Sequence, residues 1–234
     1  YLGCPSPPEG TVVPVLGLTN RVMRGSTATS QWFNVANTNA TGWPVSFGAA
    51  TETSWIELRN AWGELADGGS ARVTTLYHTA ILAPGEHLGH VVVSSTNDYG
   101  FPERLSPRIV GIAMQVMELK RSVTNVDVTV LEGHDATAVG FEVWNGGAGL
   151  MTYSITSDVS WMSVVPAAGA SVSPVSSNFH AIVFHTAGLA AGQEASGMLW
   201  IASPDGGGAR AAINVRVVAV GLPELAVGPV LLTN

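Results

Sequence analysis

Cysteine is almost absent from this chain of 234 residues. The single cysteine, Cys4, has no second cysteine to pair with, which excludes an internal disulfide framework, a cysteine-rich zinc site and a CxxC redox pair. It lies in the Pro-rich segment LGCPSPPEG. Three interpretations stay open there: a lipid-anchored cysteine, an intermolecular disulfide, or a terminal cysteine with no special role.

Charge is scarce as well. Only 12% of the residues are charged, about half the ~25% of an average soluble domain. The net charge is −7, Lys120 is the only lysine, and no run of basic residues exists. The chain therefore lacks the positive patch that binding to nucleic acid or to an anionic membrane needs. We predict no nucleic-acid partner.

Long apolar runs and long helical patterns are also missing. No stretch approaches the ~18 apolar residues of a membrane span, so we predict no transmembrane segment. The best helical candidate, residues 103–120, is interrupted by Pro107. The chain starts at Tyr1 rather than at a methionine, which leaves room for an upstream signal peptide.

Short β-type segments fill the chain instead. They are rich in Val, Ile and aromatic residues, and clusters of Gly, Pro, Asn, Asp and Ser separate them at about 8–12 residues. The segment SPDGGG at residues 203–208 is typical of a hairpin turn. This pattern predicts an all-β fold.

The chain also repeats itself with a period of about 107 residues. HTAILAPGEHLG begins at His78, and the similar HTAGLAAGQEASG begins at His185. Four further matches keep the same order along the chain: GSTAT with GHDAT, FNVAN with FEVWN, SWIEL with SWMSV, and GHVVVSS with GMLWIAS. Such ordered matches indicate an internal duplication.

The duplication predicts two tandem immunoglobulin-like antiparallel β-sandwiches. VVPVLGLTN near the start returns as VGPVLLTN at the end, so a C-terminal strand opens a third repeat. The expected domains are a Pro-rich leader at 1–10, a first repeat at 11–116, a second repeat at 117–222, and a first strand of a third repeat or donor strand at 223–234. The stretch between the repeats has no Gly/Ser linker, which predicts a semi-rigid rod.

Residues shared by both repeats are predicted to serve the fold. The expected core anchors are the aromatic residues at matching positions: Trp55 and Phe33 in the first repeat, and Trp161 and Phe141 in the second. His78 and His185 also recur at equivalent places, so we assign them a structural role.

The second repeat resembles a BACON domain, a bacterial immunoglobulin-like module whose name proposes carbohydrate binding. FEVWNGGAGLMTYSI resembles that family's strand, Asn-Gly-rich turn and following strand, and PELAV resembles its first strand. Trp161, Val164, Pro166 and Gly169 match its Trp-x-x-Val-x-Pro-x-x-Gly stretch, and HTAGLAAGQEASGMLWIAS resembles its late hairpin. The first repeat keeps Trp55 but has NAWGELADGG after it. The resemblance implies a tandem module of bacterial and phage surface proteins, with no catalytic residues.

The sequence carries no signature of an enzyme. Acidic residues are scattered, whereas glycoside hydrolysis needs two converging carboxylates. No G-x-S-x-G, H-E-x-x-H or phosphate-binding loop occurs. His87 and His90 form an H-x-x-H without an obvious third ligand, so we predict no metal site and no cofactor.

Tryptophans that differ between the repeats are candidates for surface contacts, because core positions should be shared. Alternation along FEVWN places Trp144 on the face opposite Phe141 and Val143. Filling a local gap in the core is the alternative for each of them. The predicted contacts with a glycan or a partner are Trp144, Trp200, Trp43 and Trp62.

Two functions follow from these observations. The first is a non-catalytic structural or interaction protein, part of an extracellular rod, stalk or filament on a bacterial surface, with further copies or repeats as partners. Its apolar tail would add as a strand to a neighbour, through Leu225, Val227, Val230, Leu231 and Leu232. The alternative is a carbohydrate-binding module that uses the exposed tryptophans.

Overall fold

The computed structural model describes residues 10–13, 17–38, 44–97, 103–104 and 107–222. Strands make up most of this part of the chain, and its helical elements are two short 3-10 turns, η1 (Thr79–Ile81) and η2 (Asp205–Gly207). The all-β fold class predicted from the sequence is confirmed.

The first sandwich consists of two sheets that pack face to face. The first sheet has the order β1 (Gly10–Val13), β3 (Gln31–Asn37), β7 (Ser70–Tyr77) and β5 (Ile56–Arg59). The second has the order β2 (Leu18–Met23), β10 (Arg108–Met117), β8 (Gly85–Asn97), β4 (Val45–Ala50) and β6 (Trp62–Leu65), with β9 (Glu103–Arg104) paired to β8.

The second sandwich repeats this arrangement strand for strand. Its four-stranded sheet has the order β11 (Leu119–Arg121), β13 (Val139–Asn145), β17 (Asn178–Phe184) and β15 (Met162–Val165). Its five-stranded sheet has the order β12 (Asn125–Leu131), β19 (Ala209–Val220), β18 (Glu194–Ser203), β14 (Met151–Ser157) and β16 (Ala168–Ser171). A four-stranded sheet packed on the sheet that holds the last strand is the immunoglobulin-like arrangement.

Each sandwich contains one parallel strand pair, which the expectation of purely antiparallel sheets did not include. β2 runs parallel to β10, and β12 runs parallel to β19, whereas the other pairs of the described strands are antiparallel. The cause lies at the start of each repeat. The chain pairs first with one sheet (β1, β11) and then crosses to the other (β2, β12), where it meets the last strand of its repeat in the parallel direction.

The cores follow the alternation of the strands. Phe33 and Phe141 are buried at equivalent places, and Trp55 is 6% exposed. Trp161, however, is only partly buried and stacks on Phe184 with ring centroids 6.4 Å apart. The prediction that both tryptophans are largely buried was therefore wrong for Trp161.

The space over the matching glycines Gly89 on β8 and Gly197 on β18 is occupied differently in the two sandwiches. A Cβ atom on Gly89 would lie 2.8 Å from Ile56 Cδ1, 2.9 Å from Thr53 Cγ2 and 3.0 Å from Trp55 Cζ2. On Gly197 the three nearest atoms belong to Val159 and Met162, which match Thr53 and Ile56 in the repeat. Trp161 packs at the margin of the core, where its ring is partly exposed.

The threonine of the repeated phrase HTA has the same structural role in both sandwiches. The buried Thr79 hydroxyl accepts a hydrogen bond from the Ala28 N–H (2.9 Å) and donates one to the Ser26 carbonyl (2.9 Å). Thr186 makes the same two bonds with the turn that precedes β13. One side chain thus satisfies two buried backbone groups of a turn that is remote in sequence.

The histidines of the same phrase act through their backbone. The His78 N–H donates to the Trp55 carbonyl (2.9 Å), and the His185 N–H donates to the Trp161 carbonyl (2.7 Å). Both rings are exposed. These bonds place the histidines at equivalent positions in the fold. The rings add contacts with exposed side chains, His78 Nε2 with Glu57 (3.0 Å) and His185 Nε2 with Ser163 (3.4 Å).

Replacement of Thr79 by valine tests the role of the buried hydroxyl. Thr79→Val should lower the free energy of unfolding by about 1–3 kcal/mol, because two buried backbone groups lose their partner. Chemical denaturation measures the change. Thr156→Val, at an exposed position of β14, is the matched control, and an equal effect in both variants would contradict the assignment.

Candidate functional site: the junction between the two sandwiches

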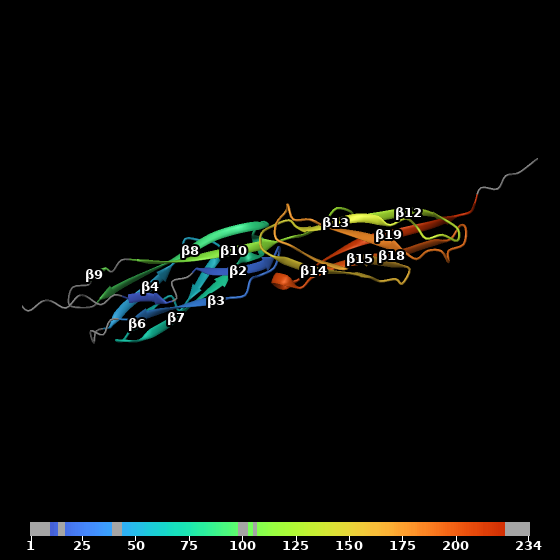
Figure 1. The fold of residues 1–234 in the computed structure, drawn as a ribbon. Coiled ribbons are helices and arrows are strands. Elements are labelled where there is room, and N and C mark those ends of the chain that lie inside the picture. Colours follow the sequence, from blue (N-terminus) through green and yellow to red (C-terminus); the bar gives the residue numbers. More distant parts are fainter. Residues whose placement is uncertain (1–9, 14–16, 39–43, 98–102, 105–106, 223–234) are drawn as a thin grey trace, which may run out of the picture.

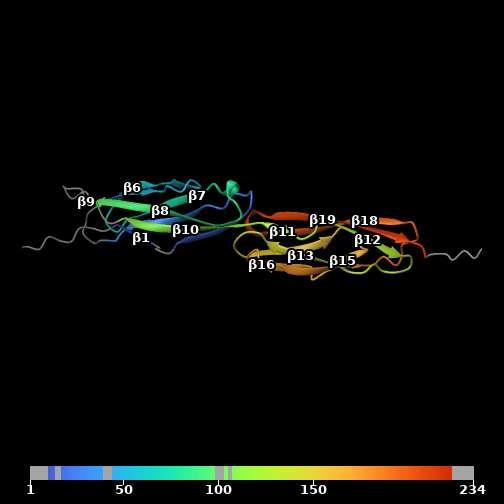
Figure 2. The same cartoon turned by 90° about the horizontal axis from the view of Figure 1, so that it is seen from above.

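The two sandwiches are joined without a linker. β10 ends at Met117 and β11 begins at Leu119, so Glu118 is the one residue between them. Two perpendicular views show the sandwiches end to end along one long axis (Figure 1, Figure 2). The residues around Glu118 therefore decide how firmly one sandwich is held on the other.

Glu118 is bonded on both sides of the junction. Its carboxylate pairs with Arg24 Nη1 (2.5 Å), from the turn after β2, and with Lys120 Nζ (3.2 Å), from β11. Its side chain is only 17% exposed. Its backbone N–H donates to Asn145 Oδ1 (3.0 Å), and its carbonyl accepts from the Gly146 N–H (2.7 Å). One residue thus ties together three segments of the chain.

The surroundings of Glu118 also set its protonation. Burial raises the pKa of the carboxyl group, but the hydrogen bonds and charges of Arg24 and Lys120 outweigh burial and hold the pKa below its ordinary value of 4.5. The side chain is therefore a carboxylate at neutral pH, and the ion pair with Arg24 is intact there.

Asn145 organises the loop NGGAG, at residues 145–149, that faces the first sandwich. Its side chain is buried. Its Oδ1 accepts from the Gly147 N–H (2.9 Å) in addition to Glu118, and its Nδ2 donates to the Gly149 carbonyl (2.7 Å). The amide therefore closes the loop on itself and fixes it to the junction residue.

This loop comes so close to the first sandwich that it requires glycine. A Cβ atom on Gly147 would overlap the carbonyl oxygen of Val116 in β10. The N–H of Ala148 donates to that same carbonyl (3.1 Å). Gly149 has φ +90°, in the left-handed region, and lies against Gln115. The contact is thus one of backbone on backbone.

A second loop of the second sandwich makes a similar contact. The sequence predicted a hairpin turn at residues 203–208, and β18 and β19 do pair around it. Gly206 has φ +57°, and a Cβ atom there would be 2.6 Å from the backbone nitrogen of Met23. The Asp205 carboxylate holds the loop by accepting from the N–H (2.6 Å) and the hydroxyl (2.7 Å) of Thr152.

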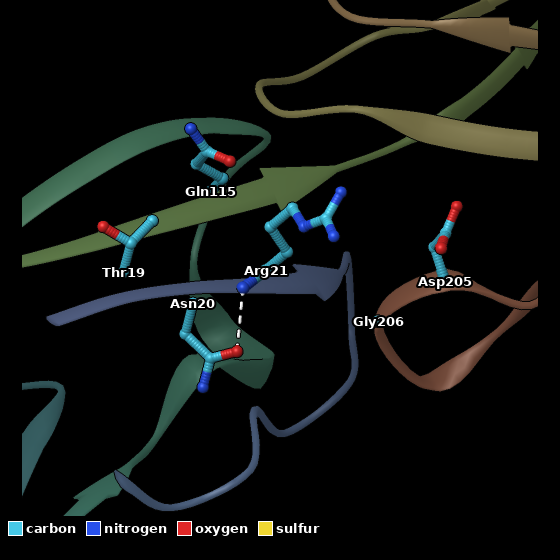
Figure 3. Close-up of a pocket in the computed structure, with 6 residues that line it drawn as sticks. All are labelled: Thr19, Asn20, Arg21, Gln115, Asp205 and Gly206. Carbon is cyan, nitrogen blue, oxygen red and sulfur yellow. Dashed lines mark hydrogen bonds between the residues drawn. The ribbon is translucent and has the colours of Figure 1, made fainter. Parts of the chain in front are cut away.

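A polar pocket of about 330 Å³ remains between the two sandwiches. Thr19, Asn20, Arg21 and Gln115 line it from the first sandwich, and Asp205 and Gly206 from the second (Figure 3). Figure 3 shows the Arg21 guanidinium reaching toward the second sandwich, where Nη1 donates to the Leu150 carbonyl (3.0 Å). Arg21 is thus a further link across the junction.

The two histidines considered for a metal site cannot share an ion. His87 and His90 lie on β8 three residues apart, and side chains at that spacing point to opposite faces of a strand. The His87 ring contacts the Ala83 carbonyl (2.8 Å). Among the described residues, no group of three His, Cys, Asp or Glu side chains is arranged to hold a metal ion.

The tryptophans predicted as contact residues lie far from one another in the topology. Trp62 on β6 is 83% exposed, Trp144 on β13 is partly buried, and Trp200 on β18 is partly covered by Arg210, whose Cζ lies 4.9 Å from the ring centroid. They belong to three different sheets. Outside the described residues lie Cys4, Trp43 and the tail residues Leu225, Val227, Val230, Leu231 and Leu232.

The sequence predicted a semi-rigid connection between the repeats but did not identify the residues that contact each other across the junction. Glu118, Arg24 and Arg21 were not singled out, because their contacts join remote segments. One signal was present: Asn37 and Asn145 end the matching phrases FNVAN and FEVWN. Both asparagines are buried, and a polar residue that recurs inside a core pattern indicates a hydrogen-bonding role.

Comparison with known proteins gives only weak structural similarities. No protein-family model matches the chain, and no curated protein matches it. Among solved structures, the D00-D0 domain of intimin is similar at 8% identity and a TM-score of 0.47, covering 91% of this chain and 100% of that one. A protein of unknown function from Porphyromonas gingivalis W83 is similar at 16% identity and a TM-score of 0.39, and the match covers 89% of this chain and 99% of that one. The YadV chaperone is similar at 10% identity and a TM-score of 0.37, and the match covers 88% of this chain and 98% of that one.

The resemblance of the second repeat to BACON domains therefore rests on the sequence motifs. In the described part of the chain, no helix has the length and apolar character to span a membrane.

Substitution of Gly147 tests the backbone contact at the junction. Gly147→Ala should destabilise the protein by about 1–3 kcal/mol and loosen the junction, because the new methyl group displaces the loop from Val116. Denaturation and small-angle X-ray scattering measure the two effects. Gly48→Ala is the control, since nothing lies within 4 Å of its Cβ position. Unchanged scattering and stability in Gly147→Ala would show that the contact is not tight.

The ion pair of Glu118 should make the junction sensitive to acid. Because the folded-state pKa is lowered, its stabilisation is fully present above about pH 4.5 and is lost as the pH falls through the folded-state pKa. Glu118→Gln should therefore be less stable than the parent at about pH 6, and the difference should shrink toward about pH 3. Denaturation at both pH values tests this, with the exposed Glu64→Gln as the control. A difference that is the same at both pH values would contradict the prediction.

Proposed function

We propose that the protein is a non-catalytic structural and interaction protein, a tandem immunoglobulin-like segment of a rod, stalk or filament on a bacterial surface. The observation that carries this proposal is the junction. A single residue separates the last strand of one sandwich from the first strand of the next, and two glycine-dependent loops lie directly on the backbone of the first sandwich.

Such a junction suits a spacer that must keep its length. A flexible linker lets two domains reorient freely, whereas here the loops at residues 145–149 and 203–208 contact the first sandwich at β10 and β2. Arg24 and Arg21 add polar contacts with the second sandwich. Bending at this point has to break backbone contacts and hydrogen bonds together.

The composition supports a location outside the cell. A surface poor in charge and rich in Ser, Thr and Gly suits an extracellular β protein, and the motifs of the second repeat resemble BACON domains of bacterial surface proteins. Further repeats or other copies of the chain are the partners that this proposal favours.

The tail at residues 223–234 resembles the first strand of a repeat, and it has two possible uses. In both sandwiches the place of the first strand is already filled by the chain itself, by β1 and β2 and by β11 and β12. This supports the use of the tail as the first strand of a further sandwich. Strand addition to a neighbour would have to use an exposed sheet edge, such as β6 or β15.

The alternative function, a glycan platform made of tryptophans, has less support. Trp62, Trp144 and Trp200 belong to different sheets, whereas one sugar chain needs its aromatic contacts on one face. Trp200 is moreover partly covered by Arg210.

Insertion of a flexible linker tests the rod. Small-angle scattering of the intact protein should give one extended distance distribution. A variant with a Gly/Ser linker between Met117 and Glu118 should give a broader distribution with shorter distances, because its sandwiches reorient. An intact protein as flexible as this variant would overturn the proposal. Electron microscopy of the protein with and without residues 223–234 tests strand addition separately, since only the intact chain should then polymerise.

A further inference from the structure

The outer face of the larger sheet of the first sandwich is apolar, although it faces water. Leu88 on β8 is 74% exposed and Ile109 on β10 is 64% exposed. Val91 and Val110 of the same two strands are buried on the inner side of the sheet. The outward positions around the two exposed side chains, on β2, β10, β8 and β4, are Thr19, Leu88, Ala113, His90, Gly111, Val92, Ile109 and Ala50. We call this set the neutral face, because His90 is its only ionisable residue.

The matching face of the second sandwich is charged. Strand register makes Ala113 equivalent to Arg216, which pairs with Glu194 (2.6 Å). It makes Leu88 equivalent to Ser196. The same fold thus accepts polar and charged side chains at these positions, so the fold does not require the apolar ones of the first sandwich.

The neutral face has a raised side chain and a hollow next to each other. On β10 the outward positions Ile109, Gly111 and Ala113 carry a large side chain, no side chain and a methyl group. Nothing lies within 4 Å of the place of a Cβ atom on Gly111, and a groove of about 330 Å³ runs past Gly111, Ala113 and Leu88. This shape is complementary to itself. A two-fold axis that crosses the strands at Gly111 places Ile109 of each copy above Ala113 of the other.

The same axis brings apolar side chains together on the neighbouring strand. On β8, Leu88 pairs with Ala113 of β10. Val92 of β8 pairs with Ile109 of β10. In the two-fold arrangement Leu88 of one copy therefore lies above Val92 of the other. We propose that two copies of the chain pair through their neutral faces, with the strands of the two facing sheets antiparallel.

The area of the face is sufficient for a second copy. The five strands of this sheet from β2 to β6 lie ~4.8 Å apart, and residues 88–94 of β8 rise ~3.3 Å each, which gives a face of roughly 24 by 23 Å. A pair of such faces buries about 1,000 Å² over both copies, near the lower limit of a specific interface. The dimer is therefore expected to be weak and to depend on concentration.

Charge also favours this face over the rest of the surface. The net charge of −7 opposes contact between two copies, but no carboxylate belongs to the neutral face. Exposed Glu86 and Glu64 lie beyond its ends. The two-fold axis places Glu86 opposite Ser94 of the other copy, so these carboxylates do not face each other. An apolar face with charges at its rim is typical of a contact between proteins.

This inference deepens the self-association in the proposed function by giving it a face, and it uses neither the junction nor residues 223–234. Because the facing strands are antiparallel and the strands follow the long axis (Figure 1), the paired chains overlap at their first sandwiches and their second sandwiches point in opposite directions. Failure of this pairing would leave the rod untouched, since the rod is measured on the monomer.

Sedimentation equilibrium of the intact protein tests the pairing, with the second sandwich supplying the variants. Between about 5 and 200 µM, the monomer should convert into a dimer as the concentration rises. Ala113→Arg places in the face the residue that the second sandwich carries there. It should weaken the dimer about tenfold or more, because Ile109 of the other copy would cover a charge. Thr129→Arg is the matched control. It adds the same charge at an exposed position of β12 whose counterpart in the first sandwich is Arg21, and it should leave the dimer unchanged.

A second variant and a stability measurement complete the test. Leu88→Ser, again the second-sandwich residue, should also weaken the dimer. Chemical denaturation at low concentration should show that both variants stay folded. A protein that remains monomeric up to about 200 µM would overturn the proposal, as would a dimer that forms equally well with Ala113→Arg and Leu88→Ser. Polymers that persist in both variants would also overturn it, in favour of strand addition by residues 223–234.

Discussion

The direct contact between the backbones of the two sandwiches is the constraint on which the rest of the structure depends. At Gly147 and Gly206 the loops of the second sandwich come within the space that a side chain would need. This distance lets the Ala148 N–H bond to the Val116 carbonyl and brings Arg24 to Glu118. Without these contacts, the single residue between the sandwiches would connect them in sequence but would not fix how one sits on the other.

The duplication separates what the fold needs from what each sandwich adds. Both copies keep the buried threonine that holds the turn before β3 or β13, and both keep the phenylalanine on that strand. The outer faces diverged, because water surrounds them and many side chains are tolerated there. The two ends differ as well. Arg24, whose side chain pairs with Glu118, corresponds to Glu132 in the second repeat, because the backbone N–H of each of them donates to the last strand of its own repeat. The far end of the second sandwich therefore cannot repeat the same ion pair.

The junction joins the two sandwiches end to end along one axis (Figure 1). The loops at residues 145–149 and 203–208 lie on the backbone of the first sandwich at β10 and β2, and Arg21 and Arg24 add polar contacts across the junction. These contacts are the basis of the rod proposed for this chain.

The sequence by itself determined the all-β class, the two tandem copies, the hairpin at residues 203–208 and the burial of Phe33 and Phe141. These follow from local patterns: strand alternation, turn residues and a repeated order of motifs. The tertiary structure decided the rest. Trp161 lies at the margin of its core, although it matches the buried Trp55 in the repeat. Glu118 meets an arginine that is 94 residues away in the chain. No local pattern encodes such distances, because they are set only when the strands pair and the sandwiches meet.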